Sequence, residues 1–131
     1  MIVYFDLDGA LIDHNDVPRP YVKEVFELLH ANECAVAIWS ASEPSYIQRQ
    51  AVRLLEKLEI NFPVIMLVKE PKSLIGHDDS IVVDNSKSEL EDFERHGMKG
   101  YKVAEYDSNL MPNDRQLLDI VEEILNIKLP S

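Results

Sequence analysis

The sequence predicts an α/β fold in which a parallel sheet is covered by helices on both faces. Two observations predict it. Short apolar runs alternate along the chain with amphipathic segments, and the first run, residues 2–5, is continuously apolar, as in a strand buried on both faces. The chain has 131 residues, 46% of them hydrophobic, which is enough for one core and too few for two ordinary domains. We therefore expect a three-layer, Rossmann-like sheet in a single domain spanning residues 1–131.

Five apolar runs are predicted to be strands, and most of the gaps between them have room for a helix. They span residues 2–5, 35–39, 63–68, 81–83 and 101–103.

The first two helices are predicted from a proline near the start and an apolar stripe of period 3.6. Pro20 stands at a first helical position, and a stripe follows over residues 22–29. Ser42 is predicted to cap the second helix, with Pro44 in its first turn and an apolar face over residues 47–58.

The last two helices are predicted in the same way. A short helix follows Asp84, with Leu90 and Phe93 one turn apart and Gly97 as its stop. The final helix is predicted over residues 112–126, where apolar residues again recur on one side.

Composition excludes several classes of protein. The chain carries 13 Lys and Arg against 24 Asp and Glu, a net charge of -11, so non-specific nucleic-acid binding is disfavoured. The single cysteine, Cys34, cannot form an intramolecular disulfide. No apolar stretch is long enough to span a membrane, and no leader pattern opens the chain. We expect a soluble, cytoplasmic protein without a membrane partner.

Polar residues follow the predicted strands at the points where they end. Asp6, Ser40 and Asp84 follow the first, second and fourth runs, and Lys69 follows the third. Because ligands bind outside the carboxyl ends of parallel strands, we expect these side chains to share one site.

The acidic residues of this edge predict a metal. Asp6 and Asp8 are one residue apart, released by Gly9, and Asp84 adds a third carboxylate. Like charges so close together are unfavourable without a cation, and an oxygen-rich set without histidine selects Mg²⁺.

The same edge predicts phosphate binding. Ser40 is expected to open the second helix, so that the N–H groups of Ala41 and Ser42 point at an anion from the helix N-terminus. Lys69, or alternatively Lys72, can contact the remaining phosphate oxygens. Magnesium, a carboxylate, a hydroxyl and a lysine together indicate phosphoryl transfer.

Four segments, taken in order, resemble the motifs of the haloacid dehalogenase (HAD) superfamily of phosphohydrolases. They are residues 4–11 (Tyr-Phe-Asp-Leu-Asp-Gly-Ala-Leu), residues 37–40 (Ala-Ile-Trp-Ser), a lysine after the third run, and residues 81–86 (Ile-Val-Val-Asp-Asn-Ser). The resemblance covers residues 1–104. Within the superfamily, the sequence is most similar to the branch of RNA-polymerase tail-domain phosphatases and related small phosphatases. The residues that carry this likeness are 19–20, 39–42, 69–70 and 84–86.

The resemblance implies a role for each residue. Asp6 is the nucleophile that forms an aspartyl-phosphate, and Asp8 is the general acid and then the base. Ser40 and Lys69 hold the phosphate. Mg²⁺ binds Asp6, Asp84 and the backbone carbonyl of Asp8.

The fold that the resemblance implies has five strands in the order 5-4-1-2-3. The segments where relatives insert a cap domain are short here, so no substantial cap is expected. The implied function is a Mg²⁺-dependent phosphatase with an open site for a small-molecule or macromolecular phosphomonoester.

Two alternatives accompany this interpretation. Ala10 stands where the superfamily usually has threonine or valine, which keeps open a catalytically weak module that binds phosphate and metal. A phosphoacceptor receiver domain uses similar residues, but its acceptor aspartate ends the third strand, whereas the third run here ends at Val68. Glu89 is a further candidate for supporting the metal, and Arg19 for reaching the site.

Overall fold

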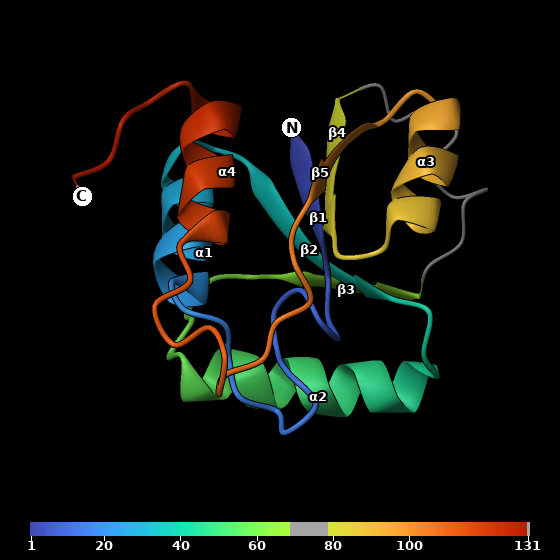
Figure 1. Ribbon diagram of the computed structural model, residues 1–131, viewed down its shortest axis with the longest axis vertical. Coiled ribbons are helices and arrows are strands. Elements are labelled where there is room, and N and C mark those ends of the chain that lie inside the picture. Colours follow the sequence, from blue (N-terminus) through green and yellow to red (C-terminus); the bar gives the residue numbers. More distant parts are fainter. Residues whose placement is uncertain (69–78, 131) are drawn as a thin grey trace.

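The structure, a computed structural model, describes residues 1–68 and 79–130, and its strands form one parallel sheet (Figure 1). The strands run in the order β3-β2-β1-β4-β5, which is the predicted order counted from the other edge, so the predicted fold is confirmed. The strands are β1 (Ile2–Asp6), β2 (Ala35–Ser40), β3 (Ile65–Val68), β4 (Ser80–Asp84) and β5 (Lys99–Lys102).

Helices cover both faces of this sheet, as predicted. Figure 1 shows α1 and α4 on one side of the sheet and α3 on the other. Alternate residues of β1 serve the two cores: Val3 and Phe5 pack with α1, α2 and α4, and Tyr4 packs with α3. This explains why the first run is continuously apolar. The helices are α1 (Val22–Ala31), α2 (Pro44–Lys57), α3 (Lys87–Arg95) and α4 (Gln116–Leu125).

The predicted start of α2 is wrong. The helix begins at Pro44 and its N-cap is Glu43, so Ser42 does not cap it. Instead the backbone N–H of Ser42 donates to Ser40 Oγ (3.2 Å). Ser40 therefore stabilises the turn that leaves β2 rather than the helix that follows.

Two other boundaries also differ from the prediction. The α4 helix begins at Gln116 rather than near residue 112, after a turn in which the Met111 N–H donates to the Asp107 carbonyl (2.9 Å). The β5 strand lies earlier than residues 101–103, because it includes Gly100, which carries no apolar signal. A Cβ at Gly100 would lie 2.9 Å from a Leu90 methyl group, so α3 packs directly onto this backbone.

The ends of α3 follow the prediction. Ser86 is the N-cap and accepts a hydrogen bond from the backbone N–H of Glu89, which fixes the first turn just beyond β4. Gly97 follows the helix with φ 87°, the left-handed conformation that glycine adopts most easily. Over residues 1–68 and 79–130, none of the helices is both long and apolar enough to cross a bilayer.

Candidate active site

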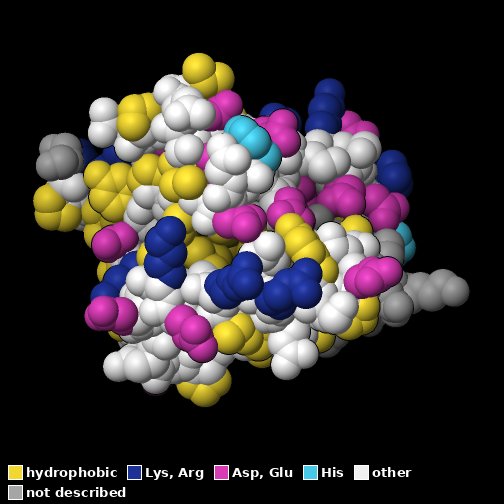
Figure 2. All heavy atoms as spheres, turned by 90° about the horizontal axis from the view of Figure 1, so that it is seen from below, with side chains coloured by type: hydrophobic (Ala, Val, Ile, Leu, Met, Phe, Trp, Pro, Cys, Tyr) yellow, Lys and Arg dark blue, Asp and Glu magenta, His cyan; other side chains and the backbone are white. Residues whose placement is uncertain are grey.

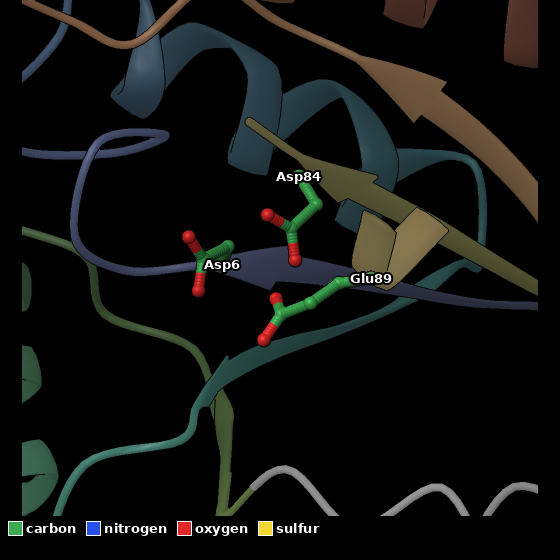
Figure 3. Close-up of side chains that lie close together, drawn as sticks. All are labelled: Asp6, Asp84 and Glu89. Carbon is green, nitrogen blue, oxygen red and sulfur yellow. The ribbon is translucent and has the colours of Figure 1, made fainter. Parts of the chain in front are cut away.

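Three carboxylates meet at the carboxyl ends of the central strands. Asp6 ends β1, Asp84 ends the neighbouring β4, and Glu89 lies in the first turn of α3. One oxygen from each lies within 4.8 Å of the others, and Figure 3 shows the side chains pointing toward one another. Asp84 is fully buried and Asp6 is 8% exposed. The structure thus brings together two of the acids predicted from strand ends and Glu89, the further candidate for supporting the metal.

Asn85 and Gly9 allow the loop that follows β1 to pack against this cluster. With its nitrogen turned toward the acids, the orientation that satisfies its neighbours, Asn85 donates to Asp6 Oδ2 (2.8 Å). The same nitrogen lies 3.3 Å from both the Asp8 carbonyl oxygen and Asp84 Oδ1. Gly9 has φ 86°, and a Cβ there would lie 3.0 Å from Asn85 Cγ, so this position favours glycine.

The Asp8 side chain is placed differently from the other acids. It is exposed, and its Oδ1 accepts a hydrogen bond from the Tyr46 hydroxyl at 2.9 Å. Its carboxylate is outside the three-acid cluster found among the described residues. This arrangement leaves the backbone carbonyl of Asp8 facing Asn85 beside the cluster, while its carboxylate faces α2.

Of the predicted phosphate-binding residues, the structure describes Ser40 and Ala41. Ser40 is buried at the end of β2, one residue beyond the partner of Asp6 in the β1–β2 register, so it lies at the same edge of the sheet. Ala41 follows in the turn and not at a helix N-terminus, since α2 begins only at Pro44. Lys69 and Lys72 lie outside the described residues.

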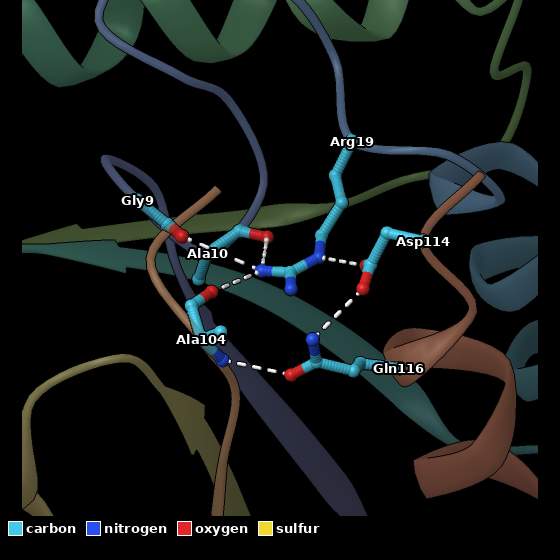
Figure 4. A network of polar contacts seen from close by, with 6 residues as sticks. All are labelled: Gly9, Ala10, Arg19, Ala104, Asp114 and Gln116. Atoms are coloured by element: carbon cyan, nitrogen blue, oxygen red, sulfur yellow. Dashed lines mark hydrogen bonds and ion pairs between the residues drawn. The ribbon is translucent and has the colours of Figure 1, made fainter. Parts of the chain in front are cut away.

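Arg19 is buried beneath the loop that follows Asp8 (Figure 4). Its Nη1 donates to the carbonyls of Ala104 (2.8 Å), Ala10 (3.3 Å) and Gly9 (3.4 Å). Its Nε donates to Asp114 in an ion pair whose side chains are 0% and 5% exposed. Arg19 therefore fixes the loop from below and does not line the candidate site.

Gln116 and Tyr106 extend this network. Gln116 donates to the second oxygen of Asp114 and accepts from the Ala104 N–H, both at 2.8 Å. The Tyr106 N–H donates to the Gly9 carbonyl (2.8 Å). The segment after β5 is thus hydrogen-bonded to the loop after β1.

Asp13 fixes the far side of the same loop. Its carboxylate accepts hydrogen bonds from the backbone N–H groups of Asn15 (2.9 Å) and Val17 (3.0 Å), and from Ser108. Burial raises the pKa of Asp13, but the hydrogen bonds from Ser108, Val17 and Asn15 outweigh it and hold that pKa well below its usual value. Asp13 is therefore a structural carboxylate.

Charge is unevenly distributed around Asp8. A cavity beside it is lined by Asp8, Asp13, Glu105 and Asp107, together with His14 and Leu110, and no described lysine or arginine lines it. By contrast, α2 carries a basic row of Arg49, Arg53 and Lys57, spaced one turn apart and exposed. Figure 2, seen from below, shows Lys and Arg side chains crossing this face of the molecule.

Sequence reasoning missed Tyr46 and Asp13. Tyr46 lies in the first turn of α2, two residues after Pro44. Its position could have been recognised from the sequence, because an aromatic residue with a hydroxyl stands at the start of the helix that follows Ser40. Asp13 had none, because its partner Ser108 lies 95 residues away.

The fold is shared with two phosphatases of known structure. D,D-heptose 1,7-bisphosphate phosphatase from Burkholderia thailandensis superposes with a TM-score of 0.71 at 14% identity, covering 95% of this chain and 97% of that one. The cobalt-bound form of the deoxy-D-mannose-octulosonate 8-phosphate phosphatase YrbI from Haemophilus influenzae gives 0.59 at 15% identity, covering 95% and 86%.

A chain of the Pnkp1/Rnl/Hen1 complex gives a TM-score of 0.63 at 19% identity, covering 80% of this chain and 46% of that one. No family model matches the sequence, and no curated protein matches it. At these identities the likeness establishes the α/β fold, and the chemistry must be argued from the site.

Proposed function

We propose that this chain is a Mg²⁺-dependent phosphomonoester phosphatase of the HAD superfamily that acts through an aspartyl-phosphate on Asp6. The observation that carries the proposal is the convergence of Asp6, Asp84 and Glu89 at adjacent strand ends, on a fold shared with two phosphatases. Ser40 at the same edge of the sheet supports it.

The donor set fits a hard divalent cation. Three carboxylate oxygens within 4.8 Å of one another, two of them on buried residues, repel strongly unless a cation lies between them. Asp6, Asp84 and Glu89, with the Asp8 backbone carbonyl, would hold it. When bound, Mg²⁺ would neutralise charge on the phosphoryl group being transferred.

The chain's own residues supply the remaining steps. The Asp6 carboxylate forms a bond to phosphorus as the bond from phosphorus to the leaving oxygen breaks, and Asp8 gives that oxygen its proton. Asp8 then takes a proton from water, which attacks the aspartyl-phosphate and releases inorganic phosphate. Ser40, the Ala41 N–H and Lys69, or alternatively Lys72, hold the phosphoryl oxygens during both steps.

Ala10 does not favour the weak-module alternative. Its side chain is fully buried, and the loop that a threonine hydroxyl would help to set is held here by Arg19, through the carbonyls of Gly9 and Ala10. A module that only binds would show phosphate and metal binding without turnover.

Phosphate release from a panel of phosphomonoesters tests the function. We expect turnover with Mg²⁺ and its loss in excess chelator, restored by added Mg²⁺. Activity that survives excess chelator would contradict the proposal.

Glucose 6-phosphate should be preferred over 6-phosphogluconate, because the carboxylates beside Asp8 repel a second anionic group and can accept hydrogen bonds from hydroxyls.

The metal site has a test that is independent of activity. Glu89→Gln should weaken Mg²⁺ binding, measured by calorimetry, by about tenfold or more, because one charged oxygen leaves the cluster. Glu91→Gln, on the exposed side of the same helix, is the matched control and should bind Mg²⁺ like the unmodified protein. Equal affinity in both variants would remove Glu89 from the site.

A further inference from the structure

Tyr46 makes a specific contact with the candidate general acid. It lies in the first turn of α2, and its hydroxyl donates to Asp8 Oδ1 at 2.9 Å. The ring is half-buried against the core, and the Arg49 guanidinium lies over it, 6.0 Å from the ring centroid. The ring therefore has both apolar packing and a cation–π contact.

The Tyr46 hydroxyl is the donor in this contact, and Asp8 Oδ1 is the acceptor. Burial raises the pKa of Tyr46 to about 12, and the hydrogen bond to Asp8 acts in the same direction.

The contact occupies one of the two Asp8 carboxylate oxygens. Among the described residues no group is hydrogen-bonded to Oδ2. An exposed aspartate without the tyrosine would sample several side-chain rotamers, whereas the Tyr46 bond selects one of them. That restriction matters for proton transfer, which requires the acid within hydrogen-bond reach of the leaving oxygen.

We infer that Tyr46 is a positioning residue: it holds the Asp8 carboxylate in the orientation from which Oδ2 protonates the leaving oxygen and then deprotonates water. The inference rests on the proposed phosphatase function. It assigns to α2 a part in the reaction that neither the strand ends nor the four sequence motifs supply.

Leaving-group dependence tests this role. In Tyr46→Phe we expect kcat/KM for an alkyl ester, glucose 6-phosphate, to fall by about tenfold or more, because an alkoxide needs the proton from Asp8. For 4-nitrophenyl phosphate, whose phenolate leaves without a proton, the fall should be less than about threefold. A structural role alone would lower both values equally.

Two further variants complete the experiment. Tyr21→Phe is the matched control, since Tyr21 is exposed and its hydroxyl has no hydrogen bond within the described residues; it should leave both values unchanged. In an Asp8→Asn background, Tyr46→Phe should add no further selective loss on the alkyl ester.

The outcomes separate the two claims. If the parent protein is active and Tyr46→Phe lowers kcat/KM equally for both esters, or for neither, the inference is overturned. The phosphatase proposal then still stands. A folded, Mg²⁺-binding parent protein that hydrolyses no ester of the phosphomonoester panel, these two included, overturns both. Circular dichroism and Mg²⁺ calorimetry on each variant show that the fold and the metal site are intact.

Discussion

Asp6→Asn should abolish phosphate release, lowering kcat by at least about a thousandfold, because the amide cannot attack phosphorus. The geometry predicts a second, opposite effect on stability. Removing one of three carboxylates that lie within 4.8 Å relieves repulsion, so without metal the variant should unfold at the same temperature or higher. Loss of activity together with retained stability is expected of a residue that serves the reaction and not the fold. Phosphate release and thermal unfolding measure the two effects.

Asp92→Asn is the matched control for this substitution. Asp92 lies on α3, and its ion pair with Arg95 is on the surface, so its loss should change neither kcat nor stability measurably. If Asp6→Asn retains kcat within about tenfold of the parent protein, Asp6 is not the nucleophile and the aspartyl-phosphate route fails.

Arg19→Met should cost about 3–5 kcal/mol of unfolding free energy, because it leaves the Asp114 carboxylate buried without its cation. The backbone carbonyls of Ala10 and Ala104 also lose the Arg19 donor, whereas the Gly9 carbonyl keeps the hydrogen bond from the Tyr106 N–H. We expect a lower kcat as well, since the loop that carries Asp8 loses its support. Urea unfolding measures the first effect and phosphate release the second.

The double variant Arg19→Met with Asp114→Asn isolates the ion pair. It should lose less stability than the sum of the two single variants, because no unpaired charge remains buried. Arg95→Met breaks an exposed pair and should change the unfolding free energy by less than about 1 kcal/mol. An equally small loss for Arg19→Met would show that the network in Figure 4 contributes little to the fold.

The sheet and the acidic edge of the site were predictable because both follow from local patterns. A continuous apolar run identified β1, and the rule that ligands bind at strand ends pointed to Asp6, Asp84 and Ser40. The register confirms that Asp6 and Ser40 reach the same edge. Ser42 was misplaced because the helix begins at Pro44 with Glu43 as its N-cap, and a serine in such a segment serves a turn as well as a helix cap.

What could not be predicted depends on contacts between distant segments. Tyr46 meets Asp8 across 38 residues, and Arg19 meets Asp114 across 95. Neither spacing leaves a periodic signal, because each contact forms only once the helices are packed on the sheet. The delayed start of α4 has the same origin, since the turn before it places Asp114 on Arg19.

The separation of Arg19 from Asp114 also sets the order in which a working enzyme can arise during translation. The strand that carries Asp6 leaves the ribosome before Asp114 and α4 do. Until then the guanidinium lacks its counter-ion and the loop after β1 lacks its support. Asp6 is thus synthesised before Asp114, yet the loop beside Asp6 takes its final form only after Asp114 has emerged.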